Sequence, residues 1–181
     1  MSLAFDLISD LHLETWGEFN WEHQATSPVC VVAGDVARDR DTVTRALRHL
    51  GKCYQAVFYV DGNDEHFHYL DDLSTSYSDL VRRIKRIPNV VYLQDNVVVI
   101  DNVAIVATNG WFSYDSDLGI DPEQVTMWVQ EEYHLSQQAT TNIKRMSSTD
   151  AEYMIASISR LQKHRSEEHT LNSSHGYISY A

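Results

Sequence analysis

The strongest constraint on the fold is a short apolar run, residues 58–60, that stops at Gly62 and is followed at once by an amide and two carboxylates. This pattern is typical of a buried strand that ends at a functional site. Two earlier stretches follow the same plan, namely residues 5–12 and residues 29–35. What this chain does therefore depends on whether these three strand ends meet in space.

The first half of the chain alternates strands and helices with short connections. This alternation indicates βαβ units and a mostly parallel sheet, hence an α/β fold. Because such crossovers are right-handed, successive strands point the same way and the loops that follow them open on one edge, where ligands bind. The pattern predicts strands at residues 4–9, 29–33 and 56–61, and helices at 41–52 and 67–87.

The second half begins with three short apolar segments, which predict a meander leading into a second sheet. The last gap between them, Asp101-Asn102, has the composition of a two-residue hairpin turn. One later helix is expected to begin at Pro122, and another at a capping box, Thr149 to Glu152, continuing to about residue 163. The three expected strands are residues 90–93, 97–100 and 103–108.

The last residues, 165–181, are a different kind of sequence. They are crowded with Ser, His and Glu and have no apolar periodicity, which predicts a disordered tail. They also resemble the conceptual translation of a short-read sequencing adapter. The hypothesis is that this segment is non-native and that the natural chain continues differently after His164.

The bulk composition bounds the class of protein. A length of 181 residues suits one domain. The formal charge of −12 repels phosphate backbones, so an extended nucleic-acid-binding surface is not expected. A small phosphoester remains compatible with this charge, because bound divalent metals reverse the local sign.

Two further features concern the expected environment. Cys30 falls in a predicted core strand and Cys53 near a helix end, so both are interpreted as reduced, packed thiols. The sequence has neither a signal peptide nor a long apolar span, which favours a cytoplasmic protein without a membrane partner.

Four side chains at the three strand ends form a candidate metal site: Asp10, His12, Asp35 and Asn63. Residues two apart in an extended segment project to the same side, so Asp10 and His12 can bind one ion. Carboxylates with an imidazole suit Mn, Fe or Zn. Two such ions can activate water for attack on a phosphoester. Each residue alone has an ordinary alternative as a cap, a turn or a surface residue; their joint appearance favours the site.

These motifs resemble those of the calcineurin-like metallophosphoesterase superfamily over about residues 3–164. The family pattern is D-x-H, then G-D-x-x, then G-N-H-[DE]; this chain has Asp10-Leu11-His12, Gly34-Asp35 and Gly62-Asn63-Asp64-Glu65. The resemblance implies a two-sheet sandwich flanked by helices (α/β/β/α) and a centre of two divalent ions. It implies that Asp10 and His12 bind the first ion, that Asp35 bridges, and that Asn63 binds the second. The implied activity is hydrolysis of a small phosphoester.

Two departures from the family pattern concern histidines. The family histidine that follows Asn63, which assists catalysis, is Asp64 here, and His66 two residues on is the candidate to replace it. Either residue is therefore a catalytic candidate, with a solvent-facing His66 as the alternative.

The second departure is that the family's later histidine motifs are missing. His134 and His164 lie in predicted helices, and His169 and His175 lie in the suspect tail. A domain of residues 1–164 that is truncated at its C-terminus, with an incomplete second sheet, is expected from this.

Two rival functions remain open at this point. One is a catalytically impaired scaffold or binding relative of the same fold, which Asp64 and the missing histidines favour. The other is a nuclease, which the acidic charge disfavours. The exact substrate, the metals and the oligomeric state are not determined by the sequence.

Other residues have weaker signals. An aromatic group in the first loop is expected either to line a pocket or to pack on the core, and a second group to border the site. The run 82–86 is interpreted as a solvated basic patch near a helix C-terminus. The first group is Trp16, Phe19 and Trp21; the second is Asn109, Trp111 and Tyr114.

Overall fold

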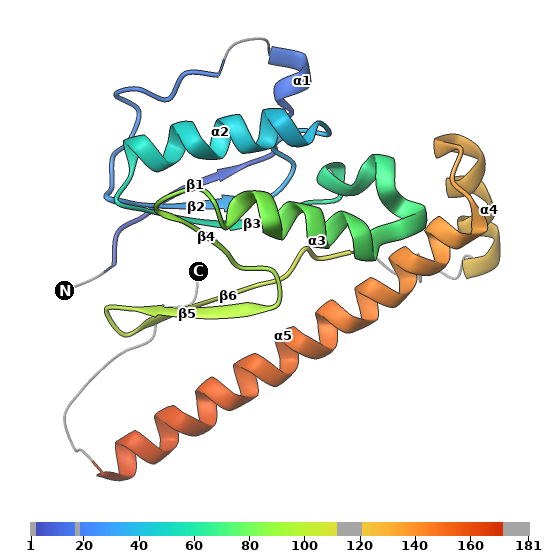
Figure 1. The fold of residues 1–181 in the computed structure, drawn as a ribbon. Coiled ribbons are helices and arrows are strands. Elements are labelled where there is room, and N and C mark those ends of the chain that lie inside the picture. The colour runs from blue at the N-terminus through green and yellow to red at the C-terminus, as the bar shows by residue number, and fades with distance from the viewer. Residues whose placement is uncertain (1–2, 17–18, 112–120, 172–181) are drawn as a thin grey trace.

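The computed structural model describes residues 3–16, 19–111 and 121–171, with side chains described up to residue 163. It is a mixed α/β fold built on a parallel sheet (Figure 1). The elements in chain order are β1 (Asp6–Ser9), α1 (Leu13–Trp16), β2 (Val29–Ala33), α2 (Arg40–Cys53), β3 (Ala56–Val60), the 3₁₀ helix η1 (Asp64–Asp72), α3 (Leu73–Ile84), β4 (Val90–Tyr92), β5 (Asn96–Ile100), β6 (Val103–Ala107), α4 (Pro122–Tyr133) and α5 (Gln137–Leu171).

The first sheet has four parallel strands in the order β1-β2-β3-β4. Its register pairs Ser9 with Ala33, and Ala33 with Val60, so the first three strands end level with one another. The predicted parallel α/β sheet is therefore confirmed, and the three polar strand ends share one edge. The sequence-based bounds of these strands hold to within two residues at each end.

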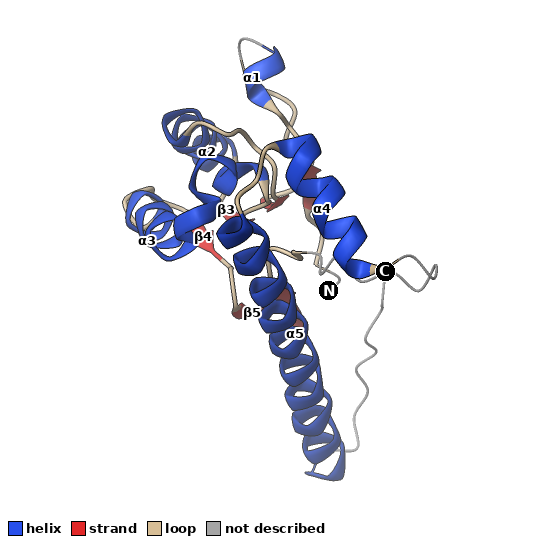
Figure 2. Ribbon diagram, turned by 90° about the vertical axis from the view of Figure 1, so that its right-hand side faces the viewer, coloured by secondary structure: helices blue, strands red, loops and turns tan. Residues whose placement is uncertain are grey.

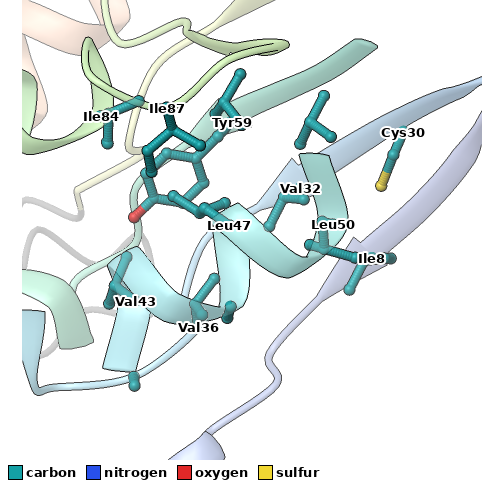
Figure 3. Packing of buried hydrophobic residues seen from close by; sticks show 14 of the residues in the cluster. Ile8, Cys30, Val32, Val36, Val43, Leu47, Leu50, Tyr59, Ile84 and Ile87 are labelled. Carbon is teal, nitrogen blue, oxygen red and sulfur yellow. The ribbon is translucent and has the colours of Figure 1, made fainter. Parts of the chain in front are cut away.

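One face of this sheet is covered by α2 and α3 (Figure 1). Helix α2 forms where expected: Asp39 caps it by accepting from the amide of Thr42, and its apolar residues recur at helical spacing. Leu47 and Leu50 of α2 lie fully buried against Val32 and Tyr59 of the sheet (Figure 3). Each such side chain contributes about 1.5–3 kcal/mol of apolar burial.

The opposite face of the sheet packs on the hairpin β5–β6. Phe58 of β3 and Leu93 are buried there against Val98 and Ile105 of the hairpin. The expected hairpin turn is confirmed, since Asp101 and Asn102 both have the positive φ that such a turn requires. The expected three-strand meander is wrong, because β4 pairs with β3 in the parallel sheet and leaves β5 and β6 as the second sheet.

The long helix α5 crosses beneath the hairpin and projects away from the parallel sheet (Figures 1 and 2). The prediction that a helix starts at Thr149 is wrong, because α5 begins at Gln137 and continues through Leu171. The Thr149 hydroxyl instead bonds to the carbonyl of Arg145, one helical turn earlier. The last residues, 172–181, lie outside the described part of the chain.

Two smaller expectations are confirmed. Helix α4 begins at Pro122, and Asp121 caps it by accepting from the amide of Glu123. Cys30 is buried and Cys53 is partly buried, and both are free thiols. Across the described ranges, no helix combines the length and the apolarity that a membrane span requires.

Candidate metal centre

The backbone pairing of β1 with β2 continues past the ends of both strands. The amide of Asp10 donates to the carbonyl of Gly34 at 3.2 Å, and the amide of His12 donates to the carbonyl of Asp35 at 3.0 Å. These bonds set the Asp10-Leu11-His12 segment beside the Gly34-Asp35 turn. The first two motifs are therefore joined by main-chain hydrogen bonds, independently of any ligand.

Two glycines let the loops after β2 and β3 approach each other closely. A Cβ built on Gly34 would lie 2.7 Å from the Cα of Gly62, and one built on Gly62 would overlap the Asp35 carboxylate. Gly34 also has φ +72°, in the left-handed region that side chains disfavour. Larger residues at either position would force Asp35 away from the edge.

Three of the four predicted metal ligands have left-handed backbone conformations. The φ angles are 53° for Asp10, 41° for His12 and 51° for Asp35. Such conformations are uncommon for residues other than glycine, and they cluster at functional sites, where the surrounding structure holds them. Three candidate ligands thus share a backbone conformation that the surrounding structure must hold in place.

Asp10, His12 and Asp35 bring one ligand atom each to within 4.8 Å of one another. This spacing allows a single cation to contact all three side chains. Burial raises the pKa of Asp35, and the negative charge of Asp64 raises it further. The backbone amide of Asp64 lowers it, because this amide donates to Oδ1 of Asp35 at 3.0 Å. A cation in this position would offset the cost of keeping these carboxylates charged.

Asp64 lies next to this group and forms a second one with His12 and Glu14, again with ligand atoms within 4.8 Å. Its Oδ2 is 3.1 Å from Nδ1 of His12 and 3.2 Å from Nε of Arg38. The Arg38 guanidinium also stacks over the ring of Phe67, 4.2 Å from its centroid. Asp64 therefore holds a positive side chain at the edge.

Two members of this arrangement were missed from the sequence. Glu14 lies two residues after His12, and the short helix α1 that carries it was not expected in what looked like an irregular loop. Arg38 follows Asp35 by three residues and has no motif that distinguishes it. The acid-rich segment after Asp10 was the one available signal for Glu14.

Asn63 is exposed and directly precedes η1. Its amide nitrogen contacts Oδ1 of Asp64 at 3.5 Å. The structure thus places Asn63 beside the Asp64 carboxylate, at the same edge as Asp35.

His66 has a different position from the other candidates. It is fully buried, which contradicts the solvent-facing alternative. Its Nε2 is 2.6 Å from Oδ2 of Asp61, and its Nδ1 is 2.7 Å from the hydroxyl of Ser76. Asp61 also accepts from the Tyr92 hydroxyl and, at 2.8 Å, from the amide of Asn109.

Both ring nitrogens of His66 are therefore engaged inside the protein. Burial alone would raise the pKa of Asp61, but its bonds to His66, Tyr92 and Asn109 outweigh this and hold its pKa below the ordinary value. This network joins the end of β3 to α3 and to the segment after β6.

Glu65 forms hydrogen bonds to the loops that carry the candidate ligands. It is fully buried, and its carboxylate accepts from the amides of Asp35 at 3.1 Å, Val36 at 2.8 Å and Gly62 at 2.8 Å. Burial raises the pKa of Glu65 to about 7, while the backbone donors act in the opposite direction. One side chain thus holds the loops after β2 and β3 together. Its position beside Asp64 in the third motif was the sequence signal for it.

The weaker candidates separate into core and border residues. Phe19 and Trp21 pack against the main core, and Trp21 donates to the Tyr54 hydroxyl at 2.7 Å. Trp16 is exposed. Asn109 and Trp111 border the buried His66 network, where Trp111 donates to the Tyr77 hydroxyl at 2.8 Å. Four other predicted residues lie outside the described residues or side chains: Tyr114, His164, His169 and His175.

Comparison with known proteins gives one informative match. The chain is similar in structure to phosphopantetheinyl hydrolase from Mycobacterium tuberculosis, with a TM-score of 0.62 and 20% sequence identity. The match covers 87% of this chain and 62% of that one, so the chain spans less than two thirds of the other protein's length. No family model and no curated protein matches the sequence significantly. The comparison therefore establishes a shared fold.

Proposed function

We propose that this protein is a metal-dependent phosphoester hydrolase with the two-sheet fold of the calcineurin-like metallophosphoesterases. The observation that carries the proposal is the convergence of Asp10, His12 and Asp35 at the carboxyl edge of a parallel sheet, each in a left-handed backbone conformation. The structural neighbour supports it, because that protein is named for a hydrolase activity. The hairpin packed on the second face of the sheet is also consistent with a two-sheet sandwich.

The donor set fits one or two divalent ions. Asp10, His12 and Asp35 would hold one ion, and His12, Glu14 and Asp64 form the second group of candidate ligands. The family resemblance would add Asn63 as a ligand of a second ion. Oxygen ligands with an imidazole suit Mn, Fe or Zn. Ions bound there would lower the pKa of bound water to about 7, which supplies a nucleophile at neutral pH.

The protein's own residues then orient the substrate. Arg38 presents a planar cation beside Asp64, the residue at the family's histidine position, and can bind phosphoryl oxygens. Asp64 positions Arg38 and His12 through its Oδ2. We assign His66 a supporting role, since both of its nitrogens are engaged by Asp61 and Ser76.

The test is hydrolysis of p-nitrophenyl phosphate and bis(p-nitrophenyl) phosphate by the purified chain with Mn²⁺. EDTA should abolish turnover. Asp35→Asn should lower the rate by about a hundredfold or more, because even groups outside the ligand shell of a metal site contribute about 10- to 100-fold. Asp101→Asn, in the hairpin turn, is the matched control and should leave the rate unchanged. Turnover that survives both EDTA and Asp35→Asn would sink the proposal.

A non-catalytic binding relative is the second candidate, and the observation that favours it is Asp64 at the family's histidine position. The two candidates differ in one outcome. A binding relative binds Mn²⁺ but hydrolyses neither ester, and the Asp35→Asn variant no longer binds the ion. A hydrolase does both.

A further inference from the structure

A groove between α2 and α3 gathers much of the positive charge of an acidic chain. The chain has 14 Lys and Arg residues against 26 Asp and Glu residues. The groove has a volume of about 700 Å³, and Asp41 is its single lining carboxylate. Six of the cationic residues line it: Arg45, Arg48, Lys52, Arg82, Arg83 and Arg86. The groove is therefore positively charged although the chain has a net negative charge, which indicates a binding site for an anion.

Helical spacing brings these cations together. Arg45, Arg48 and Lys52 recur every three to four residues, so they form one stripe along α2. Arg82 lies in the last turn of α3, and Arg86 lies two residues past the end of this helix. The two helices lie side by side on the same face of the sheet (Figures 1 and 2), so the two groups of cations face each other.

Internal ion pairs engage two of these arginines, Arg82 and Arg83. Arg83 joins the two helices, with Nη1 2.6 Å from Oδ1 of Asp41 and Nε 2.8 Å from Oδ2 of Asp79. Arg82 also pairs with Asp79. Within the described side chains, Arg45, Arg48 and Arg86 form no salt bridge. Their charges are therefore available to a ligand.

The helix dipoles explain part of this charge. Lys52 lies in the last turn of α2 and Arg82 in the last turn of α3, where cations are favoured. Arg45 and Arg48 lie in the middle of α2, where the dipole effect has fallen off. Arg45 donates one hydrogen bond, to the hydroxyl of Thr42 at 3.0 Å, and Arg48 forms no salt bridge among the described side chains.

We propose that this groove binds a small anion that carries two or more phosphate groups. Its volume lies in the range of small-ligand pockets, about 300–1,000 Å³. Its lining is dominated by arginine, whose planar fork matches phosphate oxygens. A duplex would meet the net negative charge of the surrounding surface. None of the candidate metal ligands lines the groove, so this site is separate from the metal edge.

The experiment is calorimetric titration of sodium tripolyphosphate into the full chain, freed of metal with EDTA, at low salt. Arg48→Gln combined with Arg86→Gln removes two unpaired groove charges and should weaken binding by about tenfold or more, as expected for lost charge-assisted hydrogen bonds. Lys85→Gln combined with Arg160→Gln is the matched control. It removes the same charge from exposed residues outside the groove and should change the affinity less than about twofold.

Four outcomes would overturn the proposal. They are the absence of binding, equal weakening in the two double variants, tighter binding of a poly-glutamate peptide or of duplex DNA than of tripolyphosphate, and loss of binding in Arg38→Gln, which removes the cation beside Asp64. The last outcome would mean that the anion sits at the metal edge instead. Circular dichroism and thermal unfolding check that each variant is folded.

Discussion

At the residue scale, the Glu65 carboxylate joins the two loops that carry the candidate metal ligands. It accepts from the amides of Asp35, Val36 and Gly62, and it is fully buried. A carboxylate offers acceptor positions in several directions, which is what three converging amides require. The position of Asp35 therefore depends on a side chain that does not itself face the edge.

Glu65→Gln tests this dependence. The carboxamide keeps one acceptor oxygen but turns an NH₂ group toward a backbone donor, so at least one buried amide loses its partner. We expect the free energy of unfolding to fall by about 1–3 kcal/mol. The affinity for Mn²⁺ should also fall, by about tenfold or more, because Asp35 is no longer held in place. Urea unfolding and calorimetry measure the two effects.

Glu152→Gln, at an exposed position of α5, is the control and should change neither quantity. A Glu65→Gln protein that is less stable but binds Mn²⁺ as tightly as the wild type would contradict the positioning role. Glu65 would then contribute to the fold alone.

At the element scale, Asp150 attaches α5 to the segment that follows β6. It is 2% exposed, and its carboxylate accepts from the amide of Gly110 at 3.0 Å and from the side chain of Gln94 at 3.2 Å. Burial raises the pKa of Asp150, and the Gly110 bond opposes this. Asp150 thus serves a tertiary contact in the middle of a continuous helix.

Asp150→Ala and Thr149→Ala separate this contact from the capping box that the sequence suggested. Asp150→Ala should lower the free energy of unfolding by about 1–3 kcal/mol, because a buried acceptor of two hydrogen bonds is lost. Thr149→Ala should have little effect, since an exposed threonine inside a helix loses little when replaced by alanine. Urea unfolding of both variants measures the difference.

A larger loss in Thr149→Ala would contradict the continuous helix. It would mean that Thr149 is an N-cap, whose replacement by alanine costs about 0.5–2 kcal/mol. The two substitutions are adjacent in the chain, so each serves as the control for the other.

At the scale of the whole molecule, β1 combines an apolar surface with an edge that no other described strand pairs with. It is an outer strand of the four-stranded sheet. Leu7 is 65% exposed, and Phe5, just before the strand, is 46% exposed. Leu7 lies on the sheet face that packs against the hairpin at β3. An open edge beside exposed apolar side chains favours association between molecules.

Leu7→Lys should reduce this association without changing the fold, because a charge on an edge strand opposes pairing with another strand. Light scattering as a function of protein concentration measures it. Ile155→Lys is the matched control, since Ile155 is similarly exposed, at 67%, but lies on α5, away from any strand edge. Equal effects of the two substitutions would mean that general hydrophobicity, and not the β1 edge, drives association.

The sequence by itself determined most of the parallel sheet and which residues were candidates for the site. Apolar runs, turn residues and caps act within a few residues of one another, so β2, α2 and the β5–β6 turn could be predicted from local patterns. Parallel order follows from alternation with helices, which is why Asp10, His12 and Asp35 were expected to meet.

The tertiary structure decided the features that join segments distant in the chain. Examples are the contact of Asp64 with Arg38 and His12, the three amides on Glu65, and the basic groove between α2 and α3. It also decided that α5 runs unbroken past Thr149. Local patterns do not reveal such contacts, because they depend on how helices pack against the sheet and on which buried polar group needs a partner.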